Sequence, residues 1–412
     1  MNVTKRDKWT VIYHCYLAYF ISGIVVLMFG VILPYLIEER GLSFTVAGGI
    51  LSFLAIGNLA SCVCYPLLCR RMSEKTAAVL LSFLYPVCLY LFVLDVPDVP
   101  VFVLYLLVFL IGITKGMISI VNNYAVKQVT GNSAQYLSLL HMWYAVGALL
   151  SPFLFSVLVA AGISWKLVLK FLAASTLLIV LAYLLLDFKT VQQRGKEDVA
   201  PANTETGGAS EKRDRKASFG SGFGFLKDGC FLLASGAMFC YMGLENSVNG
   251  WFVTYLENTG MMSAELSAMM VSVTWTMIMV GRIIVAFLSK KLKAHYILAV
   301  ITVIQFISVI LLIGASSPVM IVIALVIMGL GMAGCYPTTT AFAGRSLGDS
   351  PLGMSVLTGV GSIGGIFLPQ LIGVLADYMG FHAAIMFLIF DCILLVLCGV
   401  LTIPASRRRS LQ

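Results

Sequence analysis

The chain has 412 residues, of which 60% are apolar and 11% are charged, and its formal net charge is +8 at pH 7. Because a soluble domain carries about 25% charged residues, this composition indicates a membrane protein with several spans and excludes soluble enzymes and secreted disulfide scaffolds. The basic residues lie in short segments between apolar runs rather than in one patch, which argues against nucleic-acid binding.

Twelve apolar runs are long enough to cross a bilayer as helices, since a span needs about 20 residues. They occupy residues 9–37, 44–69, 76–94, 101–126, 136–161, 166–186, 229–256, 265–289, 295–314, 319–343, 353–376 and 383–404. The first run is too long for a cleavable signal peptide and continues as a spanning segment. The sequence therefore predicts an all-α membrane protein.

The distribution of basic residues sets the expected orientation. If both termini are cytoplasmic, 22 of the 27 Lys and Arg residues fall on the cytoplasmic side of the membrane. This bias is typical of multi-pass proteins. We expect the protein in the plasma membrane, which is the cell inner membrane in a bacterium, with both termini in the cytoplasm.

The polar segment 189–222 divides the apolar runs six and six. It is charged and rich in Gly, Ser and Thr, so we predict a flexible cytoplasmic linker between an N-terminal bundle, 1–188, and a C-terminal bundle, 223–412. The halves also repeat at offsets of 220 and 217 residues, where Gly23, Gly30 and Ser43 match Gly243, Gly250 and Ser263, and Gly112, Gly147 and Pro152 match Gly329, Gly364 and Pro369. These registers predict two parallel six-helix repeats.

One carboxylate lies in the middle of the seventh run. At 100° per residue, Glu245 shares a helix face with Tyr241, Asn249 and Phe252. An ionised carboxylate at this depth is costly unless it faces a partner, a cavity or water, so Glu245 is a functional candidate. The alternative is a structural ion pair that locks two helices.

A lysine lies at similar depth in the fourth run. Lys115 shares a helix face with Gly112, Ser119 and Asn122. It either binds an anionic group of a substrate or neutralises Glu245 across a cavity. The alternative is a snorkelling lysine, although the middle of a span is far for its stem to reach.

Twelve spans, a long central loop and tandem halves resemble the major facilitator superfamily over the whole chain. The basic turns at Arg70-Arg71 and Lys290-Lys291 fit this family, although both lack its usual loop acid. The stretch 137–148 with Pro152, the stretch 243–247 with Trp251 and Tyr255, and Gly281-Arg282 resemble the fifth, seventh and eighth helices of its fucose, galactose and glucose permease branch. The resemblance implies a secondary transporter that works by alternating access. One chain contains a complete carrier, so we expect it to function as a monomer.

Carriers of this build bind substrate near the midplane, between the two repeats. The candidate substrate ligands are the polar and aromatic residues on the spans expected there: Tyr19, Lys115, Asn122, Asn123, His141, Tyr144, Asn246, Asn249, Trp251, Trp275 and Tyr336. Glu245 is the candidate proton-coupling residue, and Arg282 is the candidate gate residue. A lone membrane histidine such as His141 is alternatively a helix contact.

No catalytic, metal or cofactor site is predicted. The ten cysteines are scattered over the spans and are interpreted as small apolar residues, and no ATP-binding loop occurs. We do not expect an enzyme. We expect a proton-coupled (or sodium-coupled) importer of a sugar or of a sugar-like metabolite, which includes anionic metabolites. The alternatives are a proton-antiport exporter of drugs, glycolipids or metabolites, and a sensor or scaffold that uses the 189–222 loop.

Overall fold

The computed structural model describes residues 5–94, 99–130, 133–188, 228–347 and 351–409, together with Val191, Phe225 and Leu226. The first half contributes α1 (Lys5–Arg40), α2 (Phe44–Cys69), α3 (Glu74–Phe92), α4 (Val101–Thr130), α5 (Ala134–Ala160) and α6 (Trp165–Leu185). The second half contributes α8 (Gly229–Asn258), α9 (Ala264–Leu288), α10 (Ala294–Ile313), α11 (Pro318–Met332), α12 (Cys335–Leu347), α13 (Pro351–Met379), α14 (Phe381–Met386) and α15 (Leu388–Arg409). The described part of the chain contains no strand.

Twelve spans follow from these helices, as predicted. Eleven helical stretches are long and apolar enough to cross a membrane, with α11 and α12 forming one of them and α14 and α15 another. Helix α8 is the twelfth, and its lower hydropathy reflects Glu245, Asn246 and Asn249 in its middle. Pro337 explains the break before α12, because proline has no N–H to donate to the carbonyl of Ala333 four residues earlier.

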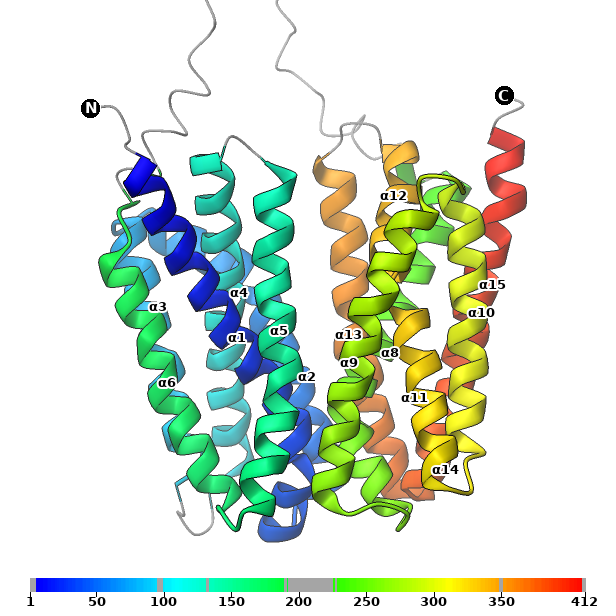
Figure 1. Ribbon diagram of the computed structural model, residues 1–412, viewed down its shortest axis with the longest axis horizontal. Helices are drawn as coiled ribbons and strands as arrows, with labels where there is room; N and C mark the ends of the chain where they lie inside the picture. Colours follow the sequence, from blue (N-terminus) through cyan, green and yellow to red (C-terminus); the bar gives the residue numbers. More distant parts are fainter. Residues whose placement is uncertain are drawn as a thin grey trace, which may run out of the picture.

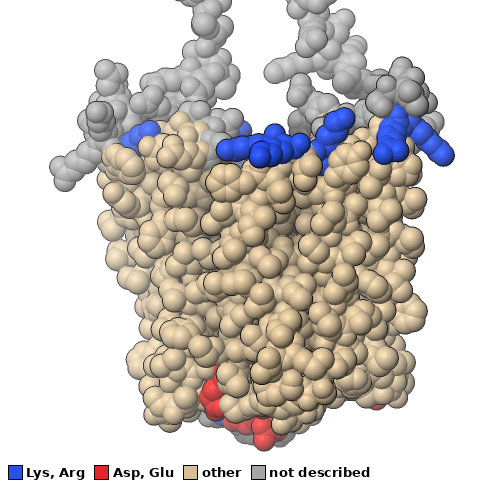
Figure 2. All heavy atoms as spheres, turned by 45° about the vertical axis from the view of Figure 1, so that its right-hand side comes forward, with Lys and Arg blue, Asp and Glu red and all other residues tan. Residues whose placement is uncertain are grey.

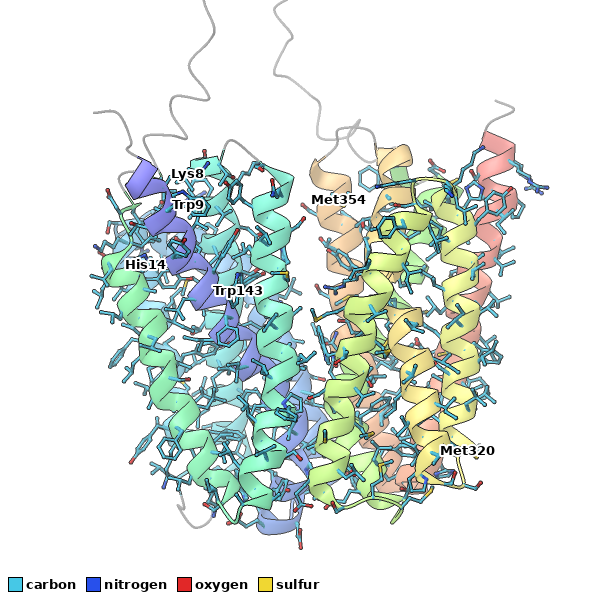
Figure 3. The ribbon with its side chains drawn as sticks, in the orientation of Figure 1. Lys8, Trp9, His14, Trp143, Met320 and Met354 are labelled. Carbon is cyan, nitrogen blue, oxygen red and sulfur yellow. The ribbon has the colours of Figure 1, made fainter. Side chains whose placement is uncertain are left out.

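Each half forms one bundle, and both ends of the chain lie on the same face of the molecule (Figure 1). We call this the terminal face and the other the opposite face. Lys and Arg side chains line the terminal face, whereas Asp and Glu gather near the opposite face (Figure 2). Lys8 and Trp9 lie near the terminal face, and Met320 lies at the opposite face (Figure 3).

The turns at the opposite face confirm the internal repeat. Gly41 and Gly260 follow the first helix of each half with φ of 59° and 68°. Gly162 and Gly380 follow the fifth span of each half with φ of 86° and 88°. Left-handed conformations at matched positions favour glycine, so the two halves reuse the same turns.

Matched glycines also bring matched helices together. A Cβ on Gly23 of α1 would lie 3.0 Å from the backbone nitrogen of Ala148 in α5. A Cβ on Gly243 of α8 would lie 3.2 Å from the carbonyl oxygen of Gly364 in α13. Because a side chain at either position would press on the neighbouring backbone, these glycines permit the close crossings.

The two halves meet near the opposite face along two seams. At the seam between α2 and α13, the Asp377 carboxylate accepts the backbone N–H groups of Phe44 and Thr45 at 2.9 and 2.8 Å. The Ser52 hydroxyl also donates to the carbonyl of Ile366 at 2.6 Å, and the Gln370 amide donates to the carbonyl of Thr45 at 3.2 Å.

The second seam joins α5 to α9. The Ser156 hydroxyl donates to the carbonyl of Glu265 at 2.7 Å, and the Ser272 hydroxyl donates to the carbonyl of Leu149 at 2.8 Å. All of these residues belong to the parts of the helices nearest the opposite face. Towards the terminal face α5 and α9 diverge (Figure 1). The halves are therefore joined at the opposite face.

Candidate functional site

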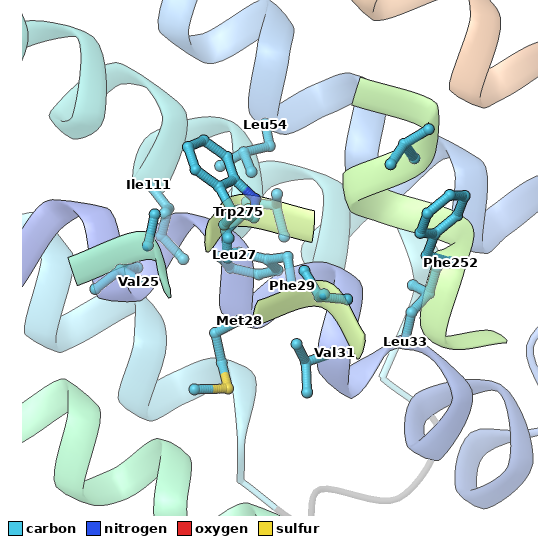
Figure 4. Packing of buried hydrophobic residues seen from close by; sticks show 14 of the residues in the cluster. Val25, Leu27, Met28, Phe29, Val31, Leu33, Leu54, Ile111, Phe252 and Trp275 are labelled. Carbon is cyan, nitrogen blue, oxygen red and sulfur yellow. The ribbon is translucent and has the colours of Figure 1, made fainter. Parts of the chain in front are cut away.

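A small cavity of about 60 Å³ lies where the two halves meet. Its polar lining is Lys115 from α4 and Asn246 and Asn249 from α8. The rest is apolar or small, including Phe29 and Leu54 (Figure 4). Since pockets for small molecules measure about 300–1,000 Å³, the cavity is too small for a sugar-sized solute in this conformation. Such a solute requires the halves to separate.

Lys115 and Glu245 lie on opposite sides of this midline, and both side chains are half-buried. In the part of the chain that the structure describes, they form no direct ion pair. They are nevertheless close enough to interact electrostatically. The two costly mid-membrane charges therefore interact across the boundary between the halves rather than within one bundle.

Glu245 is also the electrostatic centre of a group of tyrosines. Its carboxylate interacts electrostatically with the hydroxyl groups of Tyr144 in the first half and of Tyr241 and Tyr336 in the second half. Tyr241 is buried, whereas Tyr336 is 41% exposed. The carboxylate thus interacts electrostatically with phenol groups of both bundles.

The asparagines of α8 are oriented by their neighbours. The indole N–H of Trp275 in α9 donates to Oδ1 of Asn249 at 3.1 Å. The amide of Asn246 donates to the carbonyl of Met242 at 2.8 Å within α8. Both side chains line the cavity, so this face of the helix is polar at mid-depth, as predicted.

An aromatic and amide cluster forms inside the first half, from α1, α4 and α5. The Tyr19 hydroxyl lies 3.1 Å from the Ser119 hydroxyl, and Nε2 of His141 lies 3.2 Å from Oδ1 of Asn123. The Tyr19 ring lies 5.4 Å from the His141 ring and 5.1 Å from the Tyr144 ring, measured between centroids. This grouping offers ring faces and hydrogen-bonding groups together.

Next to this cluster, Trp143 of α5 packs edge-on against Phe20 at 6.0 Å and is exposed (Figure 3). Arg282 of α9 is also exposed, and it lies within electrostatic reach of His141 and of Tyr241. It therefore lies between the midline and the terminal face.

Two candidate ligands lie away from the cavity. Asn122 is buried inside the first half, where its Oδ1 accepts the Tyr183 hydroxyl of α6 at 3.0 Å. Trp251 is fully buried at the seam of the opposite face, and its indole N–H donates to the carbonyl of Pro369 at 2.9 Å. Both positions suggest packing roles.

Asp377 is a functional residue that no sequence pattern predicts. Nothing local indicates its role, because the backbone groups that it binds lie more than 300 residues earlier in the chain. Asp391 of α15 is buried beside Cys240 and has an oxygen without a hydrogen-bond partner. We have no physical account of it. Among the described residues, no group of three potential metal ligands occurs.

The model of the Major Facilitator Superfamily matches residues 15–350 of the chain. Bypass of stop codon protein 6 of Saccharomyces cerevisiae is 24% identical over 290 residues, which are 66% of this chain and 58% of that protein. The glucose/mannose transporter GlcP of Bacillus subtilis is 24% identical over 341 residues, which are 80% of this chain and 78% of that protein. The chain thus spans less than two thirds of the yeast protein's length.

Two solved structures share the fold over nearly the whole chain. The nucleoside transporter NupG is 13% identical with a TM-score of 0.72, covering 96% of this chain and 99% of that one. The E. coli fucose:proton symporter FucP is 18% identical with a TM-score of 0.54, covering 95% and 98%. At these identities the likeness shows the fold alone.

Proposed function

The chain belongs to the major facilitator superfamily, and on this premise we propose that it is a proton-coupled secondary transporter that imports a sugar or sugar-like metabolite by alternating access. We propose that the protein is located in the plasma membrane and that both of its termini lie in the cytoplasm. With that orientation, the seams at the opposite face close the outer side, and this conformation is the inward-facing one.

The observation that carries the proposal is the placement of Glu245. It interacts electrostatically with Lys115, which lines the cavity, across the boundary along which the halves must separate. That boundary is closed towards the opposite face. A bare carboxylate at this depth becomes more costly when it loses a nearby cation, so proton uptake on separation lowers the cost. Proton binding and the change of conformation are then linked at one residue.

Two observations support a sugar-like substrate. The cluster of Tyr19, Asn123, His141 and Tyr144 combines ring faces with polar groups, which suits the C–H face and hydroxyls of a sugar ring. The names of the relatives GlcP and FucP also point to hexoses, and that of NupG points to nucleosides, which contain a sugar. Lys115 extends the substrate class to anionic metabolites, because its ammonium group lines the cavity.

The proposal assigns each part of the chain a role. Segments 1–188 and 223–412 are the two rocking bundles, and 189–222, which lies mostly outside the described residues, is their cytoplasmic linker. One chain is sufficient for function, with the substrate, the proton and the lipid bilayer as its partners. It acts as a carrier and not as an enzyme, and sodium is the alternative coupling ion.

The alternative function is a proton-antiport exporter of drugs, glycolipids or metabolites. Lys115 and Glu245 interact without forming a direct ion pair, and this arrangement fits antiport as well as symport. In an antiporter the cargo and the proton would compete for the same site. The direction of proton movement distinguishes the two functions. Substrate-induced alkalinisation of the medium around cells indicates symport, whereas acidification of the lumen of preloaded vesicles indicates antiport.

The test of coupling is Glu245→Gln. The variant keeps the size and polarity of the side chain but cannot bind and release a proton, so uphill uptake is lost while substrate exchange across the membrane persists. Asp391→Asn is the matched control, because it neutralises a buried acid on α15 and should leave accumulation intact. Full proton-driven accumulation by Glu245→Gln would refute Glu245 as the coupling residue.

A further inference from the structure

A second and larger pocket, of about 740 Å³, lies at the terminal face between α9, α10 and α12. Six of its lining residues are basic or carry hydroxyl groups: Arg282, Ser289, Lys290, Lys291, Lys293 and Thr338. No acidic side chain lines the pocket in the described part of the chain. Four cations around one hollow repel each other, and an anion placed among them relieves that repulsion.

The start of α10 adds to the positive potential. Lys293 occupies the N-cap position without a side-chain cap bond, and the first turn contains no acid. The matched helix of the first half, α3, starts differently, because Ser73 accepts the N–H of Thr76 at 3.1 Å and Glu74 lies in the first turn. Side chains of the first half thus compensate the partial positive charge at the N-terminus of α3. At the N-terminus of α10, which borders the pocket, the partial positive charge of the helix dipole is not compensated.

An independent observation comes from Thr338 of α12. It lines the pocket and is only 5% exposed, and its hydroxyl makes no hydrogen bond with any part of the protein that the structure describes. Its oxygen is not sealed inside the protein, unlike that of the neighbouring Thr339, so it is open to a molecule in the pocket. Thr338 therefore provides a neutral donor among the cations.

We propose that this pocket binds a phosphate group, carried by a phospholipid headgroup at the terminal face or by a free phosphorylated solute. A phosphate monoester carries about −1.5 to −2 charges at neutral pH and three acceptor oxygens, which fits several cations and hydroxyls better than a single carboxylate does. The phosphodiester of a lipid headgroup carries a single charge and two such oxygens, so it shares the same chemistry with a smaller charge. Arg282 also lies within electrostatic reach of His141, so the pocket borders the space between the halves. This site is separate from the Lys115–Glu245 cavity and does not depend on the proposed substrate.

The test measures the melting temperature of the full chain in nanodiscs. Inorganic phosphate is titrated in phosphatidylcholine discs, and phosphatidylglycerol is introduced in a second series without phosphate, with chloride at equal ionic strength as the reference. At least one series should show saturable stabilisation. The triple variant Lys290→Ala, Lys291→Ala, Lys293→Ala should weaken the apparent Kd about tenfold or more.

The matched control is the triple variant Arg70→Ala, Arg71→Ala, Lys75→Ala. It removes the same charge from the corresponding turn of the first half and should bind as the unaltered chain does. Stabilisation by phosphate in phosphatidylcholine identifies a free solute as the source, and stabilisation by phosphatidylglycerol alone identifies a lipid headgroup. Equal responses of the two triple variants, or equal effects of chloride, would overturn the proposal.

If the triple variant Lys290→Ala, Lys291→Ala, Lys293→Ala does not fold, a milder variant tests whether the pocket binds phosphate. Thr338→Val keeps every charge and removes only the hydroxyl that lines the pocket, so the apparent Kd should weaken about fivefold. An unchanged Kd in this variant would then overturn the site.

Discussion

At the scale of single residues, Lys115 is the side chain whose chemistry most restricts the ligand. Its ammonium group lines a cavity whose other polar groups are neutral amides, and its opposite charge, Glu245, belongs to the other half. An ion pair that only locked two helices would be expected in direct contact, and this pair is not. The geometry therefore favours the interpretation that an anionic group or a proton takes part here.

Lys115→Ala tests this interpretation by ligand-induced thermal stabilisation. A sugar acid that binds through the ammonium group should lose about tenfold or more in affinity, because a charge-assisted hydrogen bond contributes about 1.5–3 kcal/mol. A neutral sugar should bind with little change. Equal losses for both ligands would show that the substitution disturbs the cavity as a whole rather than an anion contact.

Helical periodicity predicts the surroundings of the polar residues on α8 but not those of the polar residues on α4. The 3.6-residue period correctly groups Glu245 with Asn249 and Tyr241 on one face of α8. The same period groups Asn122 with Lys115, yet Asn122 bonds to Tyr183 inside the bundle. Periodicity gives the direction in which a side chain leaves its helix, but not which helix lies there.

At the scale of elements, the seam between α2 and α13 depends on a capping interaction shared between halves. The first N–H groups of a helix lack partners within it, and here Asp377 of α13 supplies them for α2. The interaction can form only while the opposite face is closed. Asp377 therefore stabilises that conformation and not its open counterpart.

Asp377→Ala should shift the equilibrium towards the conformation with the opposite face open. Loss of an exposed cap costs about 1 kcal/mol, which corresponds to about a fivefold change in population. In a cysteine-free background, spin labels at Glu38 and Asn258 report the separation of the halves by pulsed electron resonance. The expected result is a larger population at long distance.

Ser263→Ala is the matched control for this seam. Ser263 caps α9 by accepting the N–H of Leu266 at 3.3 Å within one half, so its loss weakens a helix end without breaking a bond between the halves. If the two variants gave the same distance distribution, Asp377 would act only on local helix stability.

At the scale of the whole molecule, the spans and the repeat are predictable and the conformation is not. Eleven spans stand out by hydropathy and α8 is the twelfth, and the register of Ser43 with Ser263 matches two serine caps, on α2 and α9. The composition of the spans is the same whichever face is closed. Which face closes depends on pairs such as Ser52 with Ile366, whose separation in the sequence leaves no local pattern.

If the halves move as rigid bodies, a clash confined to their seam should change conformation and not folding. A Cβ on Gly48 of α2 would lie 3.0 Å from the carbonyl oxygen of Pro369 and 3.4 Å from the Cα of Gly373, both on α13. Gly48→Val should therefore hold the opposite face open, with long label distances and a bundle that still folds. Gly359→Ala on α13 is the control, because a Cβ there meets nothing within 4 Å. A Gly48→Val variant with unchanged distances and a lower melting temperature would mean that the seam is part of a rigid core, and alternating access about this boundary would have to be abandoned.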